Sequence, residues 1–301
     1  SKIPLREYNM DPIEVMISES QERMLFVIEQ GWEEKVCRIF DKYRLRNALI
    51  GRATENTDLE IRKDGVTLAE IPSAVLANAP LISRKSKKPN YIDSLAEITA
   101  PKQPSYYLAM LKSMLALPNI SSKRWVYEQY DHEVGIRTVT KPGQAGASVL
   151  RLPNGKFLAL RADGNSRHSF LDPYQGSAGA MAEASRNVIA VGAKPIAMLD
   201  HIQFGDPGNP EVFWSFEQSV KGIADYSRSL EIPCIGGKVS FYNEDKFTNK
   251  AIKPSPVITV IGLIDQQKDL MGPKFCGGSN VILVIGMTRS EMGGSEYYEE
   301  I

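Results

Sequence analysis

Short apolar runs and polar turns alternate through the first 80 residues in a pattern that predicts a β-α-β-β unit. RMLFVIE (23–29) is an apolar run short enough to be a strand. A helix should follow it, because large apolar residues recur at helical spacing, at Trp32, Val36, Ile39, Phe40 and Tyr43. NALIGRA (47–53) indicates another strand, and LEIRKDGVTLAEI (59–71) alternates about Asp64-Gly65, which favours a β-hairpin.

The segment 83–104, SRKSKKPNYIDSLAEITAPKQP, differs in composition from the chain on either side. It has three prolines, a basic cluster and little periodicity, which predicts a linker over the surface. The cluster, Arg84, Lys85, Lys87 and Lys88, could be a phosphate or partner patch, but we favour a solvated linker.

Beyond residue 105, apolar strands alternate with helical patterns. ASVLRLPNGKFLALRADG (147–164) predicts two strands joined through Asn154-Gly155, and a helix is expected over about 177–191, ended by Gly192. After a strand at 195–204, Asn209-Pro210 favours the start of a helix that continues to about Leu230. Further strands are expected in IPCIGG (232–237), PVITVIGLI (256–264) and SNVILVIGM (279–287). This order predicts an α/β (α+β) fold with helices on one face of a sheet.

Composition excludes several classes of partner. Of 301 residues, 43% are hydrophobic, and Lys+Arg and Asp+Glu both total 36, so no overall field favours nucleic acid or an acidic membrane. We find no run of apolar residues long enough to span a membrane and no signal peptide. The three cysteines, Cys37, Cys234 and Cys276, have no zinc spacing and predict reduced, mostly buried thiols in a cytoplasmic protein.

IGGKVSFYNED (235–245) looks like a phosphate loop but fails as one. A Walker loop needs a glycine at Ile232 and a Ser or Thr at Val239. A glycine pair at a strand end remains, where backbone N–H groups can approach a phosphate, although an ordinary turn is favoured on these residues alone. An extended chain would place Lys238 and Ser240 on the same face.

Other polar residues allow two interpretations. Glu183 and Asn187 lie four apart on the predicted helix and could share a cation, but an exposed helix face would look the same. Asp163, Asn165, Arg167 and Asp172 are of the types that hold Mg²⁺ and phosphate, but turn chemistry could also explain them. Asp200 and His201 should point to opposite faces of a strand, which argues against a dyad. We find no nucleophile and base at a recognisable spacing.

Taken together, the segments resemble the synthetase subunit of phosphoribosylformylglycinamidine synthase. The matching strings follow in the family's order over nearly the whole chain: PLREYNMDPIEVMISESQERMLFVI, SSKRWVYEQYDHEV, DGNSRHSFLDPYQGSAGAMAEASRNVIAVGAKPIAMLD, NPEVFWSFEQSVKGIADYSRSL, GGKVSFYNE and GGSEY. The family's chain is internally duplicated. The resemblance implies the end of a first C-terminal-type domain (1–82), a linker (83–104), a second N-terminal-type α/β domain related to aminoimidazole ribonucleotide synthetase (105–268) and the start of a second C-terminal-type domain (269–301).

This resemblance implies an ATP-dependent ligase of purine biosynthesis. It would convert formylglycinamide ribonucleotide to the amidine, with ATP and Mg²⁺ as cofactors and ammonia from a glutaminase subunit held by a small bridging subunit. The family's catalytic histidines lie in a domain before these segments, so no catalytic residue is expected here and this chain alone should be inactive. An unpaired domain would expose apolar surface, so a homo-oligomer is also expected.

Site residues follow from matching positions. Glu19, Ser20, Gln21 and Ser240 are implied to bind substrate, and Asp200 and Gly237 to bind nucleotide. Glu183 and Asn187 match residues that hold Mg²⁺ at an auxiliary nucleotide site of long single-chain relatives.

Lys238 departs from the family's pattern, because most short-form members have a metal-ligating asparagine there. An ammonium cannot ligate a metal, so Lys238 is assigned to phosphate contact. A non-catalytic nucleotide-binding scaffold or paralogue is the alternative. Aminoimidazole ribonucleotide synthetase and selenophosphate synthetase rank lower, because they lack the SESQERM and SFYNE pair.

Overall fold

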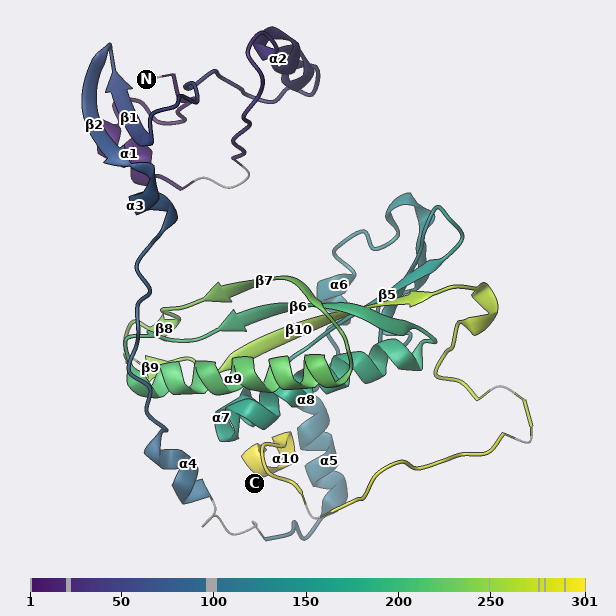
Figure 1. Ribbon diagram of the computed structural model, residues 1–301. Coiled ribbons are helices and arrows are strands. Elements are labelled where there is room, and N and C mark those ends of the chain that lie inside the picture. Colours follow the sequence, from purple (N-terminus) through teal and green to yellow (C-terminus); the bar gives the residue numbers. More distant parts are fainter. Residues whose placement is uncertain are drawn as a thin grey trace. The chain divides into compact units, whose positions relative to one another are not determined.

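The computed structural model describes residues 2–19, 23–95, 102–248, 250–275, 277–278, 280–289 and 291–300 (Figure 1). The chain divides into two compact units, Ser1–Ile82 and Ser83–Ile301. Each unit contains its own β-sheet.

The N-terminal unit consists of short helices and one hairpin. Helix α1 (Pro12–Ile17) begins at Asp11, whose carboxylate accepts the N–H groups of Ile13 and Glu14 while the Glu14 side chain accepts the Asp11 N–H. This capping box satisfies N–H groups that the first turn leaves unpaired. The remaining elements are α2 (Glu33–Lys42), β1 (Asp58–Lys63), β2 (Val66–Pro72) and α3 (Ser73–Ala77).

The predicted helix and hairpin of this unit are confirmed. Asp64 and Gly65 both have positive φ angles, 52° and 84°, as the tight turn between β1 and β2 requires. The strands predicted at 23–29 and 47–53 are wrong. Neither stretch has regular secondary structure, and Val27 is 82% exposed. An apolar run favours burial, but a strand also needs a neighbour to pair with its N–H and C=O groups, and in the described part of this unit only β1 and β2 pair.

The C-terminal unit is built on a six-stranded sheet of order β3-β4-β5-β10-β6-β7 (Figure 1). Its strands are β3 (Thr138–Thr140), β4 (Ser148–Arg151), β5 (Phe157–Asp163), β6 (Lys194–Gln203), β7 (Cys234–Ser240) and β10 (Ser255–Ile264). Neighbouring strands are antiparallel, except that β6 and β7 run parallel. The C-terminal ends of β6 and β7 therefore meet at the same edge of the sheet.

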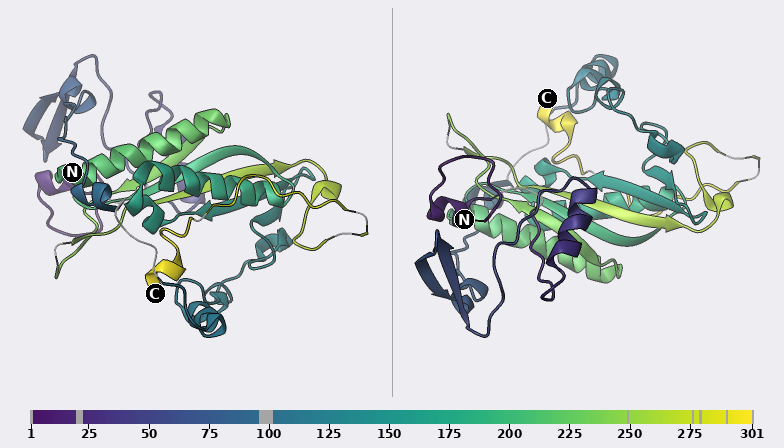
Figure 2. Two further views of the ribbon diagram at one scale, coloured as in Figure 1. Left: turned by 90° about the horizontal axis from the view of Figure 1, so that it is seen from below. Right: turned by 90° about the horizontal axis from the view of Figure 1, so that it is seen from above.

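Two long helices, α8 (Pro173–Ala190) and α9 (Pro210–Ser229), cover one face of this sheet (Figures 1 and 2). The core lies between them and the sheet, and includes the buried Met181 and Val188 of α8 and the buried Met198 of β6. Along β10, fully buried residues alternate with half-buried ones, so the other face of the sheet is apolar and partly exposed. The predicted helix-covered sheet is confirmed.

Local signals set the helix ends. The Asn209 side chain accepts the Glu211 N–H at 2.9 Å and Pro210 is the first residue of α9, as predicted. Helix α8 begins at Pro173, earlier than residue 177, because Asp172 caps it through the Gln175 N–H. Gly192, at φ +92°, follows its end.

Short elements surround the sheet: α4 (Asn90–Ser94), α5 (Tyr107–Ala116), α6 (Arg124–Tyr127), α7 (Ser166–Leu171), β8 (Glu244–Asp245), β9 (Lys250–Ala251), α10 (Glu296–Glu300) and 3-10 turns at Val134–Ile136 and Gln267–Asp269. Helix α4 lies in the segment expected to be a linker. Its Tyr91 ring stacks on Phe170, with 4.3 Å between ring centroids, and its hydroxyl donates to the Phe170 carbonyl at 2.8 Å. Burial raises the pKa of Tyr91 to about 12.

Two further predictions fail. Residues 280–287 form no strand, and Ile285 is 95% exposed, because no described strand lies alongside them to complete a ladder. Cys234 is exposed rather than buried, since it begins the edge strand β7, and Cys37 is partly exposed; Cys276 lies outside the described residues. In the described part of the chain, we find no helix long and apolar enough to cross a membrane.

Candidate functional site

Asp200 and Gly237 lie side by side on the parallel strands β6 and β7. A Cβ atom added to Gly237 would lie 1.5 Å from Asp200 Oδ1 and 3.0 Å from the Asp200 carbonyl oxygen. This position therefore requires glycine, because the carboxylate lies directly against its backbone. Asp200 lies two residues from both Met198 and Ile202, which are buried, so it shares their helix-covered face of the sheet.

Lys238 and Ser240 share the opposite face of the sheet. They pair with His201 and Gln203 in the register of β6 and β7. Lys238 is exposed and Ser240 is half-buried. The sequence thus brings two pairs to one edge, Asp200 with Gly237 and Lys238 with Ser240, and β alternation separates the pairs by the thickness of the sheet.

The turn after β7 is fastened to the end of β6 by Asn243. Its Nδ2 donates to the carbonyl oxygens of Phe204, at 3.0 Å, and Ser240, at 2.9 Å, and lies 3.2 Å from Ser240 Oγ. Tyr242 adopts a positive φ of 61° within this turn. Sequence reasoning missed Asn243 as a positioning residue; its signal was an amide at the end of SFYN, where a side chain can reach back to the strand.

The predicted substrate motif lies in the N-terminal unit. Glu19 is exposed just after α1, while Ser20 and Gln21 lie outside the described residues. Ser18 ends α1: its N–H donates to the Glu14 carbonyl at 2.8 Å and its hydroxyl to the Val15 carbonyl at 3.0 Å.

Glu183 and Asn187 lie on α8 against β5. Asn187 Nδ2 donates to Asp163 Oδ2 at 3.1 Å, and Arg161 Nε donates to both Asp163 oxygens, at 2.9 and 2.8 Å. Asp163 is buried, and its hydrogen bond raises the pKa of Arg161 above its already high value. A pocket of about 300 Å³ adjoins this cluster, lined by Tyr127, Lys141, Pro142, Gly143, Ala145, Gly146, Ala147, Ser148, Leu160, Arg161 and Ala162.

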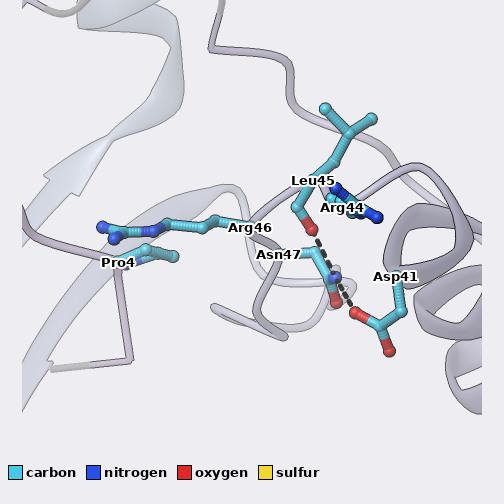
Figure 3. Close-up of a pocket in the computed structure, with 6 residues that line it drawn as sticks. All are labelled: Pro4, Asp41, Arg44, Leu45, Arg46 and Asn47. Atoms are coloured by element: carbon cyan, nitrogen blue, oxygen red, sulfur yellow. Dashed lines mark hydrogen bonds between the residues drawn. The ribbon is translucent and has the colours of Figure 1, made fainter.

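A more open depression, of about 440 Å³, lies in the N-terminal unit (Figure 3). Its lining consists of Pro4, Asp41, Arg44, Leu45, Arg46 and Asn47. The Asn47 amide donates to Asp41 Oδ1 at 2.9 Å and to the Leu45 carbonyl at 3.1 Å, which closes the end of α2. No residue predicted from the sequence to bind a ligand lines this depression, and its polar contacts are those of a helix end.

A cluster of metal-ligating side chains is not found in the described ranges. Within them, no group of three or more His, Cys, Asp and Glu side chains could hold a metal ion. His201 lies on β6 beside Lys238, on the face away from Asp200, as the strand alternation predicted. The described geometry offers a backbone approach, a cation and a hydroxyl at the ends of β6 and β7.

Comparison with known proteins shows that two stretches of the chain each match a family model. Residues 144–264 match the AIR synthase related protein, N-terminal domain, and residues 1–64 match the AIR synthase related protein, C-terminal domain. The expected mixed α/β fold of this type is thereby confirmed. The first match covers the six-stranded sheet from β4 to β10 together with α8 and α9.

Individual relatives match almost the whole chain. Phosphoribosylformylglycinamidine synthase subunit PurL from Methanothermobacter marburgensis is 43% identical over 301 residues, which are 99% of this chain and 41% of that protein. The solved structure of PurLQS from Thermotoga maritima has a TM-score of 0.70 at 27% identity, over 91% of this chain and 43% of that chain. T. maritima PurL complexed with ATP and with FGAR each give a TM-score of 0.68 at 27% identity, over 89% of this chain and 42% and 40% of those chains.

Proposed function

We propose that this chain, a homologue of the PurL subunit over 99% of its length, contributes one wall of the ATP and substrate site of an amidine-forming ligase. The reaction converts formylglycinamide ribonucleotide to formylglycinamidine ribonucleotide in purine biosynthesis. The observation that carries the proposal is the match of nearly every residue, in order, to proteins named phosphoribosylformylglycinamidine synthase. The chain spans 41% of the length of those relatives, so the activity concerns the assembled enzyme.

The proposed reaction has two steps. The amide oxygen of the substrate attacks the terminal phosphorus of ATP, ADP leaves, and an imidate phosphate forms. Ammonia then adds to the imidate carbon and phosphate leaves, which yields the amidine. Such chemistry depends on positioned phosphates and on cations that stabilise developing charge, and it needs no protein nucleophile.

Four residues at the ends of β6 and β7 are assigned to this wall. Gly237 has no side chain, so a nucleotide can approach its backbone, and the adjacent Asp200 orients polar groups of the nucleotide. Ser240 contacts the substrate, and Lys238 supplies positive charge to a phosphate from the same face. In the N-terminal unit, Glu19, Ser20 and Gln21 are proposed to contact substrate.

Mg²⁺ is proposed to enter with ATP, and it would neutralise phosphate charge. Lys238 stands where most short-form relatives are expected to have a metal-ligating asparagine, so this chain offers an ammonium at that place. The contacts around Glu183 and Asn187 do not fit the expected auxiliary metal site, because the Asn187 amide NH₂ donates to Asp163, whose carboxylate Arg161 already holds.

The proposed macromolecular partners are a glutaminase subunit, which supplies ammonia, and a small bridging subunit. A solved structure of PurLQS from T. maritima is among the similar structures and supports an assembly of this kind. Self-association through the partly exposed apolar face of the sheet, which carries Val257, Ile261 and Leu263, is proposed for the chain by itself.

The proposal is tested in the assembled enzyme with Asp200→Asn, with Asp265→Asn as matched control. Asp265 is an exposed carboxylate paired with Lys156 just after the end of β10, seven residues from Ile258, which pairs with Asp200, so its substitution should leave ATP affinity unchanged. D200N should raise the KM for ATP about tenfold or more, since loss of one charged hydrogen bond costs about 1.5–3 kcal/mol. Equal KM values for wild type, D200N and D265N would contradict the assigned role of Asp200.

A nucleotide-binding scaffold without catalysis is the alternative. It is favoured by Lys238, an unusual residue at a position where metal ligation is expected. The two hypotheses differ in turnover: the assembled ligase should form the amidine, whereas a scaffold should bind ATP and form none. The 301-residue chain alone is expected to bind ATP weakly and to have no synthetase activity. Full turnover by this chain would contradict the expectation that the catalytic residues lie in another domain.

A further inference from the structure

In the cluster between α8 and β5, the buried carboxylate is already paired with a cation. Arg161 and Asp163 are two residues apart on β5 and alternate in step with the core residues Phe157 and Ala159, so both side chains lie on the helix-covered face. The Arg161 guanidinium holds both oxygens of the buried Asp163 carboxylate through Nε, at 2.9 and 2.8 Å, and Nη2 donates to the same group. The carboxylate also accepts Asn187 Nδ2 at 3.1 Å.

The atoms that this arrangement places around Asp163 are hydrogen-bond donors and cannot ligate a metal. Mg²⁺ requires oxygen ligands in nearly ideal octahedral geometry. Asn187 presents its NH₂ group to Asp163, and its oxygen faces Gly146, where an added Cβ atom would lie 2.5 Å away. Glu183, one turn earlier on α8, is exposed and interacts electrostatically with Arg161. A divalent ion between these groups would meet a guanidinium and an amide NH₂.

We infer that Arg161 is the resident cation of this cluster, so that Asp163, Glu183 and Asn187 bind no divalent metal. Its role is to neutralise the buried Asp163 and to fix α8 against β5 through the chain Arg161, Asp163 and Asn187. On this inference, the Glu and Asn four residues apart on α8 do not mark a metal site. The inference concerns the chain's own residues and does not rest on the proposed activity.

The metal arm of the test uses the nucleotide-free 301-residue chain, freed of metal by chelation and dialysis. Thermal unfolding is followed at rising Mg²⁺ and, separately, Mn²⁺ for wild type, Glu183→Gln and Asn187→Ala. The expected result is that all three proteins show the same change in Tm with each ion. A rise in Tm with either ion that is present in wild type and lost in E183Q or N187A would overturn the inference.

The cation arm compares Arg161→Gln with the matched control Arg228→Gln. Arg228 pairs with Asp225 on the exposed surface of α9, at 3.1 Å, so R228Q should leave Tm nearly unchanged. R161Q leaves Asp163 buried without its cation and should lower Tm by roughly 4–8 °C, less than for a fully buried pair because Arg161 is partly exposed. Equal Tm values for R161Q and R228Q would overturn the role of Arg161. If R161Q does not fold, the metal arm decides.

Discussion

Gly237→Ala is a sharp test of the close packing at the ends of β6 and β7. The added Cβ would lie 1.5 Å from Asp200 Oδ1, 2.7 Å from Asp200 Cγ and 3.0 Å from the Asp200 carbonyl oxygen. The carboxylate can rotate away, but the carbonyl belongs to the backbone of a paired strand and can retreat only by disturbing the sheet. Overpacking of this kind costs about 1–3 kcal/mol of unfolding free energy.

The neighbouring glycine provides the control. A Cβ added to Gly236 lies 3.6 Å from Leu199 Cδ2, an ordinary contact distance. Gly236→Ala should therefore be neutral or stabilising by up to about 1 kcal/mol, since glycine weakens a strand. The two variants should then differ by roughly 1–4 kcal/mol in unfolding free energy, at about 2–4 °C of Tm per kcal/mol for a unit of this size.

Thermal unfolding of both variants, and of each combined with Asp200→Ala, measures the effect. D200A removes Oδ1 and Cγ but leaves the Asp200 carbonyl, so it should return only part of the stability lost in G237A and change G236A little. ATP binding is measured by calorimetry on the same proteins, and G237A should bind ATP less tightly than G236A. Equal stability of G237A and G236A would refute the packing argument. Lower stability of G237A with unchanged ATP affinity would refute backbone approach at Gly237.

Three further predictions concern charge. Lys238→Asn in the assembled ligase should raise the KM for ATP and change the Mg²⁺ dependence of the rate; an unchanged profile in steady-state kinetics would contradict phosphate contact. Tyr91→Phe should reduce the fall in stability as the pH rises from 10.0 to about 12. Burial raises the pKa of Tyr91 in the folded protein to about 12, so the stability that the neutral hydroxyl contributes is fully present below pH 10.0 and is lost as the pH rises to about 12. Measurement of Tm against pH checks this. The hydrogen bond from Arg167 lowers the pKa of Glu296 below 4.5, so the Tm difference between wild type and Glu296→Gln should be present above that pH and disappear in acid; a difference independent of pH would contradict the ion pair.

Signals that act over a few residues could be predicted from the sequence. The Asn209 side chain accepts the N–H of Glu211, two residues later, and Pro210 already has the φ of a first helical residue. The start of α9 can therefore be predicted from these two adjacent residues. The turns at Asp64-Gly65 and Gly192 could be predicted in the same way, because glycine itself tolerates the positive φ that each turn requires. These features needed no knowledge of distant parts of the chain.

Apolar runs were less informative, because a strand depends on its neighbours. Residues 23–29 and 256–264 both have the composition of a strand, yet only the second pairs, with β5 on one side and β6 on the other. In the first, Phe26 contacts Phe40 of α2, with 5.1 Å between ring centroids, while Val27 is 82% exposed. The difference lies in the strands alongside, which local composition does not encode.

The candidate sites show the same limit at the scale of single side chains. Asp200 and Lys238 were grouped by similarity of position, but only the register of β6 against β7 assigns them to opposite faces of the sheet. The group of β5 that Asn187 contacts depends in turn on how α8 packs against that strand. Two oxygen-bearing residues four apart on a helix indicate a metal site only if the facing strand supplies a further anion. At β5 it supplies a cation and an anion two residues apart, on one face, and they satisfy each other.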